Sequence, residues 1–213
     1  MIDLARRRMM MGCSSKPYDA EVEYLESTGT QWIDTGIIAN ADISMESCFA
    51  ITATPYFFVQ GMSLNQNCAI VVMGQYYNES TLSAVFATGN REGASIPFDY
   101  EYHIYYVSRH YQKVDDVTTH ITSGDTLGYN PIIGVYRQLI PIYLFARNID
   151  WSADWNKAYM KCRKKYDKIW YRNILIADYI PVRKNGIGYM YDKVSGQLFG
   201  NQGTGNFIFG PDK

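Results

Sequence analysis

The sequence predicts an all-β domain in which two antiparallel sheets pack face to face as a sandwich. About a dozen short runs of apolar or alternating residues can be distinguished, and Gly, Asn, Asp or Pro separates each from the next. No long stretch repeats its apolar residues at the helical spacing of about 3.6. The chain has 213 residues, which suffices for one sizeable core, and it contains no internal repeat that would indicate a second domain.

The clearest strands close the chain. Between Ile174 and Phe209, apolar runs follow one another and are separated by Lys184-Asn185-Gly186, by residues 192–196 and by residues 200–205. Asn and Gly accept the positive φ of tight turns, so Asn-Gly and Ser-Gly between alternating runs favour hairpins. This part of the sequence predicts a closing antiparallel meander.

The earlier strands are shorter and less regular. In the first of them, Val22 and Tyr24 alternate with Glu21 and Glu23, which predicts one buried face and one solvated face. The strands expected before the meander lie at residues 21–26, 31–38, 46–53, 57–61, 69–73, 82–87, 100–108, 118–122, 132–136 and 142–147.

Two segments resemble the bracketing signatures of a known family. EVEYLESTGTQWIDTGI (residues 21–37) opens the domain, and ADYIPVRKNGIGYMYDKVSGQLFGNQGTGNF (residues 177–207) closes it. Together they resemble concanavalin A-like, laminin-G-like (LamG) jelly-roll proteins, a family common among structural proteins of tailed gut phages, crAss-like phages included. The resemblance implies a two-sheet antiparallel jelly-roll sandwich in a virion, and it implies no chemistry. We expect the opening and final segments of the chain to pair with each other.

One segment allows two interpretations. Trp151, Trp155, Tyr159 and Cys162 recur at helical spacing, which favours a helix. The family resemblance instead implies a long strand at residues 159–171, whose apolar residues alternate only if a β-bulge interrupts them. We favour the strand and expect a loop at residues 149–157.

Composition excludes some function classes. Twenty basic and 21 acidic residues leave a net charge of −1, which supplies no basic surplus for nucleic acid. No run approaches the roughly 18 apolar residues of a membrane span. The 19 tyrosines suit half-buried sheet faces and binding surfaces, because the ring packs while the hydroxyl stays solvated.

The amino terminus predicts an anchoring arm over residues 1–18, ahead of a jelly-roll domain over residues 19–213. Its apolar part is too short for a signal peptide, and position 2 is not Gly, so neither a lipoprotein signal nor N-myristoylation is expected. Apolar side chains can enter a groove on a neighbouring virion protein while arginines pair with acidic groups. The alternative is an unattached tail. The candidate anchoring residues are Ile2, Leu4, Arg6, Arg7, Arg8, Met9 and Met10.

No residue pattern predicts an enzyme. Glu21, Glu23 and Glu26 resemble the carboxylate spacing of glycoside hydrolases of this fold, but the third carboxylate would face away from the others on a regular strand. We expect them to be solvated surface charges. No nucleophile elbow and no phosphate-binding loop is present.

The sequence gives equally little support for a metal site or a disulfide. The spacing of His103, His110 and His120 matches no zinc pattern, so no metal residue is assigned. Loop carboxylates leave a bound calcium ion as an alternative, since relatives of this fold often hold one in their loops. The carboxylates in question are Asp115, Asp116, Asp150 and Asp154. Cysteines are expected to be free, with a pairing of Cys48 and Cys68 left open.

Glycan binding is the activity that the loops favour. The apolar face of a pyranose packs on an aromatic ring, while Asn, Asp or Gln binds its hydroxyls. The alternative for these aromatic residues is packing at the rim of the sandwich or contact with a neighbouring subunit. The candidate glycan-binding residues are Tyr76, Tyr77, Trp151, Trp155 and Asn156.

We therefore expect a non-enzymatic structural protein on the surface of a phage particle: a capsid decoration, head-fibre or tail-associated protein. Its partners would be other virion proteins, bound through the arm, further copies of itself, and host or mucosal glycans; neither nucleic acid nor membrane is expected. The alternative is a glycan-binding or glycoside-hydrolysing protein of a gut bacterium.

Overall fold

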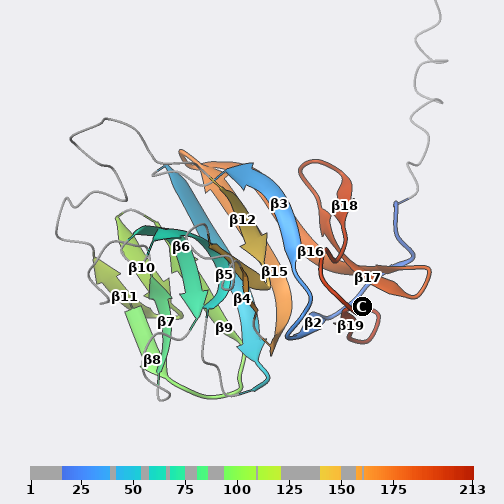
Figure 1. The fold of residues 1–213 in the computed structure, drawn as a ribbon, viewed down its shortest axis with the longest axis horizontal. Coiled ribbons are helices and arrows are strands. Elements are labelled where there is room, and N and C mark those ends of the chain that lie inside the picture. Colours follow the sequence, from blue (N-terminus) through green and yellow to red (C-terminus); the bar gives the residue numbers. More distant parts are fainter. Residues whose placement is uncertain are drawn as a thin grey trace, which may run out of the picture.

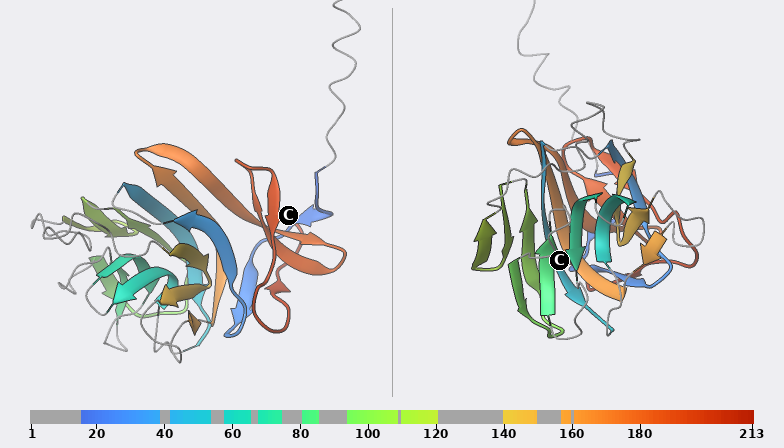
Figure 2. Two further views of the ribbon diagram at one scale, coloured as in Figure 1. Left: turned by 45° about the horizontal axis from the view of Figure 1, so that its top comes forward. Right: turned by 60° about the vertical axis from the view of Figure 1, so that its left-hand side comes forward.

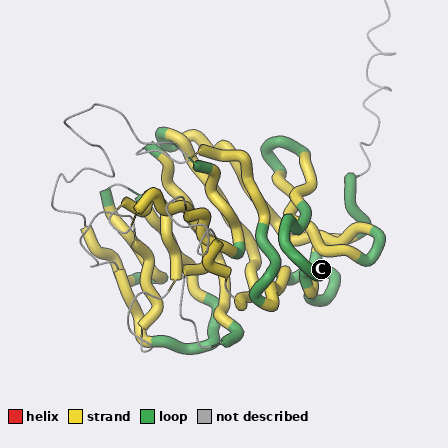
Figure 3. The backbone as a smooth tube through the Cα atoms, in the orientation of Figure 1, coloured by secondary structure: helices red, strands yellow, loops and turns green. Residues whose placement is uncertain are grey.

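The computed structural model describes residues 16–38, 42–53, 58–65, 68–74, 81–85, 94–108, 110–120, 140–149, 157–159 and 161–213. Within these ranges the chain forms strands, turns and loops and no helix (Figure 3). The predicted all-β class is confirmed. No helix in the described ranges is therefore long and apolar enough to cross a membrane.

The strands form two sheets (Figures 1 and 2). The larger sheet has the order β11-β10-β9-β4-β15-β16-β17-β18, with β1 on β16, β2 on β15 and β19 on β2. The smaller sheet has the order β14-β13-β5-β6-β7-β8, and β12 pairs with both β3 and β5.

The described strand pairs are antiparallel, except that β13 runs parallel to β5. The bounds are β1 Ala20–Glu21, β2 Leu25–Thr28, β3 Ile33–Ile38, β4 Ile43–Ile51, β5 Phe58–Asn65, β6 Cys68–Gly74, β7 Thr81–Val85, β8 Ala94–Pro97, β9 His103–Val107, β10 Tyr111–Val114, β11 Val117–His120, β12 Pro141–Leu144, β13 Ala146–Ile149, β14 Lys157–Tyr159, β15 Lys161–Tyr171, β16 Ile174–Lys184, β17 Ile187–Asp192, β18 Gln197–Phe199 and β19 Ile208–Phe209.

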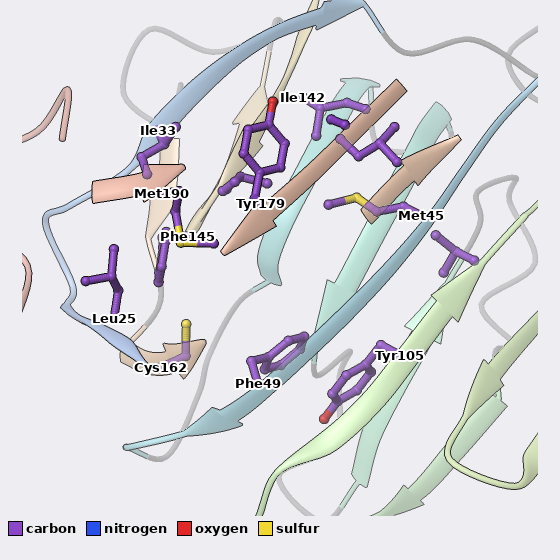
Figure 4. Packing of buried hydrophobic residues seen from close by; sticks show 14 of the residues in the cluster. Leu25, Ile33, Met45, Phe49, Tyr105, Ile142, Phe145, Cys162, Tyr179 and Met190 are labelled. Atoms are coloured by element: carbon purple, nitrogen blue, oxygen red, sulfur yellow. The ribbon is translucent and has the colours of Figure 1, made fainter. Parts of the chain in front are cut away.

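The core draws on both sheets. Met45, Phe49 and Tyr105 come from the larger sheet, Ile33 and Ile142 from the smaller one, and all five side chains are fully buried (Figure 4). The rings of Phe49 and Tyr105 stack with their centroids 4.1 Å apart. Burying apolar area of this kind is the main stabilising contribution to such a domain.

The opening and final segments of the chain pair with each other, as expected. β1 lies on β16, β19 lies on β2, and Val22 forms an isolated bridge with Asp212. Arg183 donates to both carboxylate oxygens of Asp212 at 2.7 Å. Tyr18, the last residue of the predicted arm, is already buried, with its ring 5.0 Å from that of Tyr191.

The two signature segments also contact each other through a glycine-rich loop. The amides of Gln202 and Thr204 donate to the carbonyls of Trp32 and Thr30, at 2.8 and 3.3 Å. Between them, Gly203 lies so close to the Thr30 carbonyl that an added Cβ would be 1.9 Å from its oxygen. Only glycine permits this approach.

The strand predicted at residues 159–171 is confirmed over residues 161–171, where β15 also contains the bulge that the prediction requires, whereas Tyr159 belongs to β14, which pairs with β13. Lys164 is opposite Phe49 on β4, and Tyr166 is opposite its neighbour Cys48, so Lys165 is the extra residue. Before the bulge Lys164 faces the core, and after it Asp167 faces the core. A regular strand would place residues three apart on opposite faces.

The sequence missed or misplaced some elements. The strands Ala94–Pro97 and Tyr111–Val114 were not expected, and the expected strand at 132–136 lies outside the described residues. The alternation predicted for Val22 and Tyr24 holds only for Val22 and Glu23, which are buried and exposed, because the strand breaks after Glu21 and resumes at Leu25. Val22 and Leu25 are therefore the buried residues, whereas Tyr24 is only half-buried.

The cysteines agree with the expectation of free thiols where the structure describes them. Cys48 and Cys162 are both free and buried. The alternative that Cys48 pairs with Cys68 is wrong, because the thiol of Cys48 is free.

Candidate functional site

A row of aromatic rings, supplied by four strands, lies on the outer face of the larger sheet. We name it the aromatic row: His120, Tyr111, Tyr106 and Trp170, from β11, β10, β9 and β15. The centroids of Tyr106 and Tyr111 are 5.0 Å apart with nearly parallel planes. His120 lies 6.2 Å from Tyr111, and Trp170 lies 6.4 Å from Tyr106. The rings therefore form one continuous surface.

Strand register places this row away from the core. Tyr105 and Val107 are fully buried, so Tyr106 between them faces outward. Tyr106 is opposite Glu46 on β4, and Glu46 is opposite Lys168 on β15. Directly paired residues share a face, so Lys168 and Trp170, two residues further on, lie on the same side as Tyr106.

Charged side chains lie on the same face of the larger sheet as the row. Lys168 Nζ lies 3.8 Å from a carboxylate oxygen of Glu46 and 5.1 Å from the ring centre of Tyr166. Lys165, turned outward at the bulge, places its Nζ 3.9 Å from the ring centre of Tyr102. Cation–π contacts of this kind hold flexible lysines beside aromatic rings. Ammonium and carboxylate groups thus stand at the edge of an apolar surface.

The hydroxyls of Tyr102, Tyr111 and Tyr166 stay protonated at physiological pH. Burial raises the pKa of Tyr102 to about 12, and burial also raises the pKa of Tyr111 and of Tyr166. These three phenols are therefore neutral donors and acceptors of hydrogen bonds. Aromatic rings with hydroxyl, ammonium and carboxylate groups around them suit a sugar, whose C–H face stacks and whose hydroxyls form hydrogen bonds.

The sequence did not identify this row. All the candidate glycan-binding residues, Tyr76, Tyr77, Trp151, Trp155 and Asn156, lie outside the described residues, as do all the anchoring residues Ile2 to Met10. The tyrosines of β9 and β10 were visible in the sequence. Their common face depends on pairings between strands that are distant in the chain, which a single sequence does not reveal.

The carboxylates that resemble a hydrolase motif are engaged elsewhere. Glu21 accepts hydrogen bonds from Lys16 Nζ and Tyr18 Oη, both at 2.9 Å, and Glu26 accepts one from Arg163 Nε at 2.7 Å. The hydrogen bond from Lys16 lowers the pKa of Glu21, which opposes the raised pKa that a general acid needs. Glu23 is exposed.

A histidine lies between two carboxylates at one end of the larger sheet. His103 Nδ1 is 2.6 Å from Asp115 Oδ2, and His103 Nε2 is 2.8 Å from Asp99 Oδ1. Asp115 Oδ1 accepts the Ile104 amide at 2.8 Å, from a turn where Asp115 has φ 48°. We name His103, Asp99 and Asp115 the histidine clamp. It ties the loop before β9 to the β10–β11 turn.

The histidine clamp engages one of the carboxylates considered for calcium. Both carboxylate oxygens of Asp115 already accept hydrogen bonds, from His103 and Ile104. Asp116 is exposed, and Asp150 and Asp154 lie outside the described residues. In the part of the chain that the structure describes, no group of three or more His, Cys, Asp or Glu side chains is arranged to hold a metal ion.

The clamp predicts a pH dependence of stability. Burial alone would lower the pKa of His103, but Asp99 and Asp115 outweigh it and raise that pKa. A group whose pKa is higher in the folded state stabilises the fold. This stabilisation is complete below the pKa of the unfolded state and is lost as the pH rises through the pKa of the folded state. The free energy of unfolding should therefore fall between about pH 6 and pH 8, by at most about 1 kcal/mol because the carboxylates are half-exposed.

Urea unfolding at the two pH values measures this change, with His103→Gln removing the titrating group. The His103→Gln variant should lose the pH dependence, whereas the exposed control His110→Gln should keep it. An equal pH dependence in wild type and His103→Gln would contradict the assignment. At acidic pH the sign reverses, because the hydrogen bond from His103 lowers the pKa of Asp99, and its contribution is lost as pH falls through that lowered value.

The geometry thus presents one open aromatic surface and one charged clamp, on the same sheet. No protein-family model matches this chain, and neither a curated protein nor a solved structure is similar enough to it to count as a match.

Proposed function

We propose that this protein is a non-enzymatic virion structural protein with a concanavalin A-like jelly-roll domain that binds glycans. The observation that carries the binding function is the aromatic row. Tyr106 and Tyr111 stack, Trp170 extends the surface, and Lys168 with Glu46 stands beside it. Partly exposed aromatic rings with charged groups beside them fit a sugar chain lying across the strands.

The virion context is supported by the resemblance of residues 21–37 and 177–207 to the phage family. The contacts of Trp32 and Thr30 with Gln202 and Thr204 give both segments a shared structural role, because each holds the other in place. This mutual packing is what a bracketing pair of signatures would preserve in a jelly roll.

A glycan array with the full chain tests the binding function. We expect retention of particular host or mucosal glycans, and a roughly tenfold loss of affinity for Tyr106→Ala and for Trp170→Ala, since a lost stacking contact costs about 1.4 kcal/mol. Trp170→Phe, which keeps an aromatic ring, should retain most of the binding.

Tyr100→Ala is the matched control. Tyr100 is 58% exposed and its ring packs on Phe98, outside the row. It should bind like wild type. If the row variants bind as well as the Tyr100 variant, the row is not the site. Release of reducing sugar from a bound glycan would instead favour the glycoside-hydrolysing alternative.

The anchoring arm is tested separately by removing residues 1–15. The chain is produced together with the structural proteins of its particle, with and without these residues, and particles are purified. We expect only the full chain to co-purify with them. Equal incorporation of the truncated chain would show that the arm is not the anchor, without affecting the glycan result.

A further inference from the structure

An amine, a carboxamide and a carboxyl group meet in the interior of the sandwich. Lys164 Nζ contacts Gln60 Oε1 and lies 2.9 Å from Asp167 Oδ1 and 3.2 Å from Ser47 Oγ. Gln60 belongs to β5 of the smaller sheet, and the other three residues belong to the larger sheet. Lys164, Asp167 and Gln60 are all fully buried. We name these four residues the buried cluster.

Aromatic rings enclose the amine. Lys164 Nζ lies 5.5 Å from the ring centre of Phe49 and 5.1 Å from that of Phe145, and Figure 4 shows both rings within the core. Asp167 Oδ2 has no hydrogen-bond partner among the described residues. Two opposite charges so fully removed from water are costly, and their mutual attraction repays this only when every remaining polar atom is satisfied. As an ion pair, the cluster therefore leaves Asp167 Oδ2 without a hydrogen bond from the described residues.

We propose that Lys164 and Gln60 form an intramolecular isopeptide bond that joins the two sheets, with Asp167 as the proton carrier. The amine of Lys164, the carboxamide of Gln60 and the carboxyl of Asp167 are already in contact, and no other molecule is required. This inference is independent of the glycan function.

The step balances as follows in atoms and protons. Asp167 takes one proton from the Lys164 ammonium, and the neutral Nζ then attacks Cδ of Gln60. A new C–N bond forms, the Cδ–Nε2 bond breaks, and ammonia leaves with one proton that came from Nζ. The product is a secondary amide, one ammonia molecule and a neutral Asp167 carboxylic acid; nothing is oxidised or reduced.

The surroundings favour this product. Burial raises the pKa of Asp167 above its ordinary value, even though Lys164 opposes that shift, so the site tolerates a protonated carboxyl. After the reaction the cluster holds no charge, and the acid hydrogen of Asp167 can be donated to a neighbouring oxygen. The cost of burying an ion pair is then removed.

The intact mass of the purified full chain tests the proposal. We expect it to be lower than the sequence mass by one ammonia molecule, and digestion should yield a branched peptide that joins the segment around Gln60 to that around Lys164. A folded wild-type chain at the full sequence mass, with both segments recovered as separate peptides, would overturn the proposal.

Two variants complete the test. Asn185-Gly186 can also lose ammonia, through a succinimide, so Lys164→Met is the matched control: it should abolish the branched peptide and leave any succinimide unchanged. Asp167→Asn should give the unlinked chain at full mass. If Asp167→Asn still contains the branched peptide, Asp167 is not the proton carrier. The mass of the wild-type chain shows whether the bond between Lys164 and Gln60 forms, even if a variant fails to fold.

Discussion

Replacing Gly203 by alanine is expected to lower the free energy of unfolding by about 3 kcal/mol, because the new methyl group would meet backbone rather than a yielding side chain. The added Cβ would lie 1.9 Å from the Thr30 carbonyl oxygen. Relief requires the loop to move away from Thr30 and Trp32, which breaks the hydrogen bonds from Thr204 and Gln202. Urea unfolding measures the loss.

Gly186→Ala is the control for this prediction. Gly186 has φ +74° but an added Cβ would have no neighbour within 4 Å, so only backbone strain remains. That strain costs about 1 kcal/mol. If the two variants lose the same stability, the close approach at Gly203 is not what requires glycine, and the mutual packing of the two signature segments loses its main support.

Replacing Asp167 by alanine is the second change with a large expected effect. Without Asp167 the bond to Gln60 is not expected to form, so Lys164 would keep a fully buried amine with no carboxylate beside it, and an uncompensated buried charge of this kind typically costs about 3–5 kcal/mol. The expected result is a midpoint of urea unfolding far below that of wild type.

The double variant Lys164→Met with Asp167→Leu separates charge from packing. It leaves no unpaired buried charge, so it should be more stable than Asp167→Ala alone. A double variant as unstable as the single one would show that the shape of the cluster matters more than its charges. Comparing the two variants with each other keeps this test valid whether or not Lys164 is linked to Gln60.

Some parts of this structure were predictable because their causes are local. Asn185 and Gly186 adopt φ of 52° and 74°, the conformation for which Asn-Gly is suited, and the hairpin of β16 and β17 follows from them. The break in alternation along residues 161–171 likewise required a bulge in any strand. The strand Tyr111–Val114 was missed because it is short and carries no distinctive pattern between its turns.

The sequence by itself determined the all-β class and the closing meander, since alternation and turn residues act over a few neighbouring positions. The pairing of the chain's two ends was expected from the resemblance of its two signature segments, not from local pattern. Only the tertiary structure decided that Tyr106, Tyr111 and Trp170 share one face and that Gln60 meets Lys164 and Asp167. These groupings depend on the register between strands far apart in the chain, where a shift of one residue would turn every side chain to the opposite face.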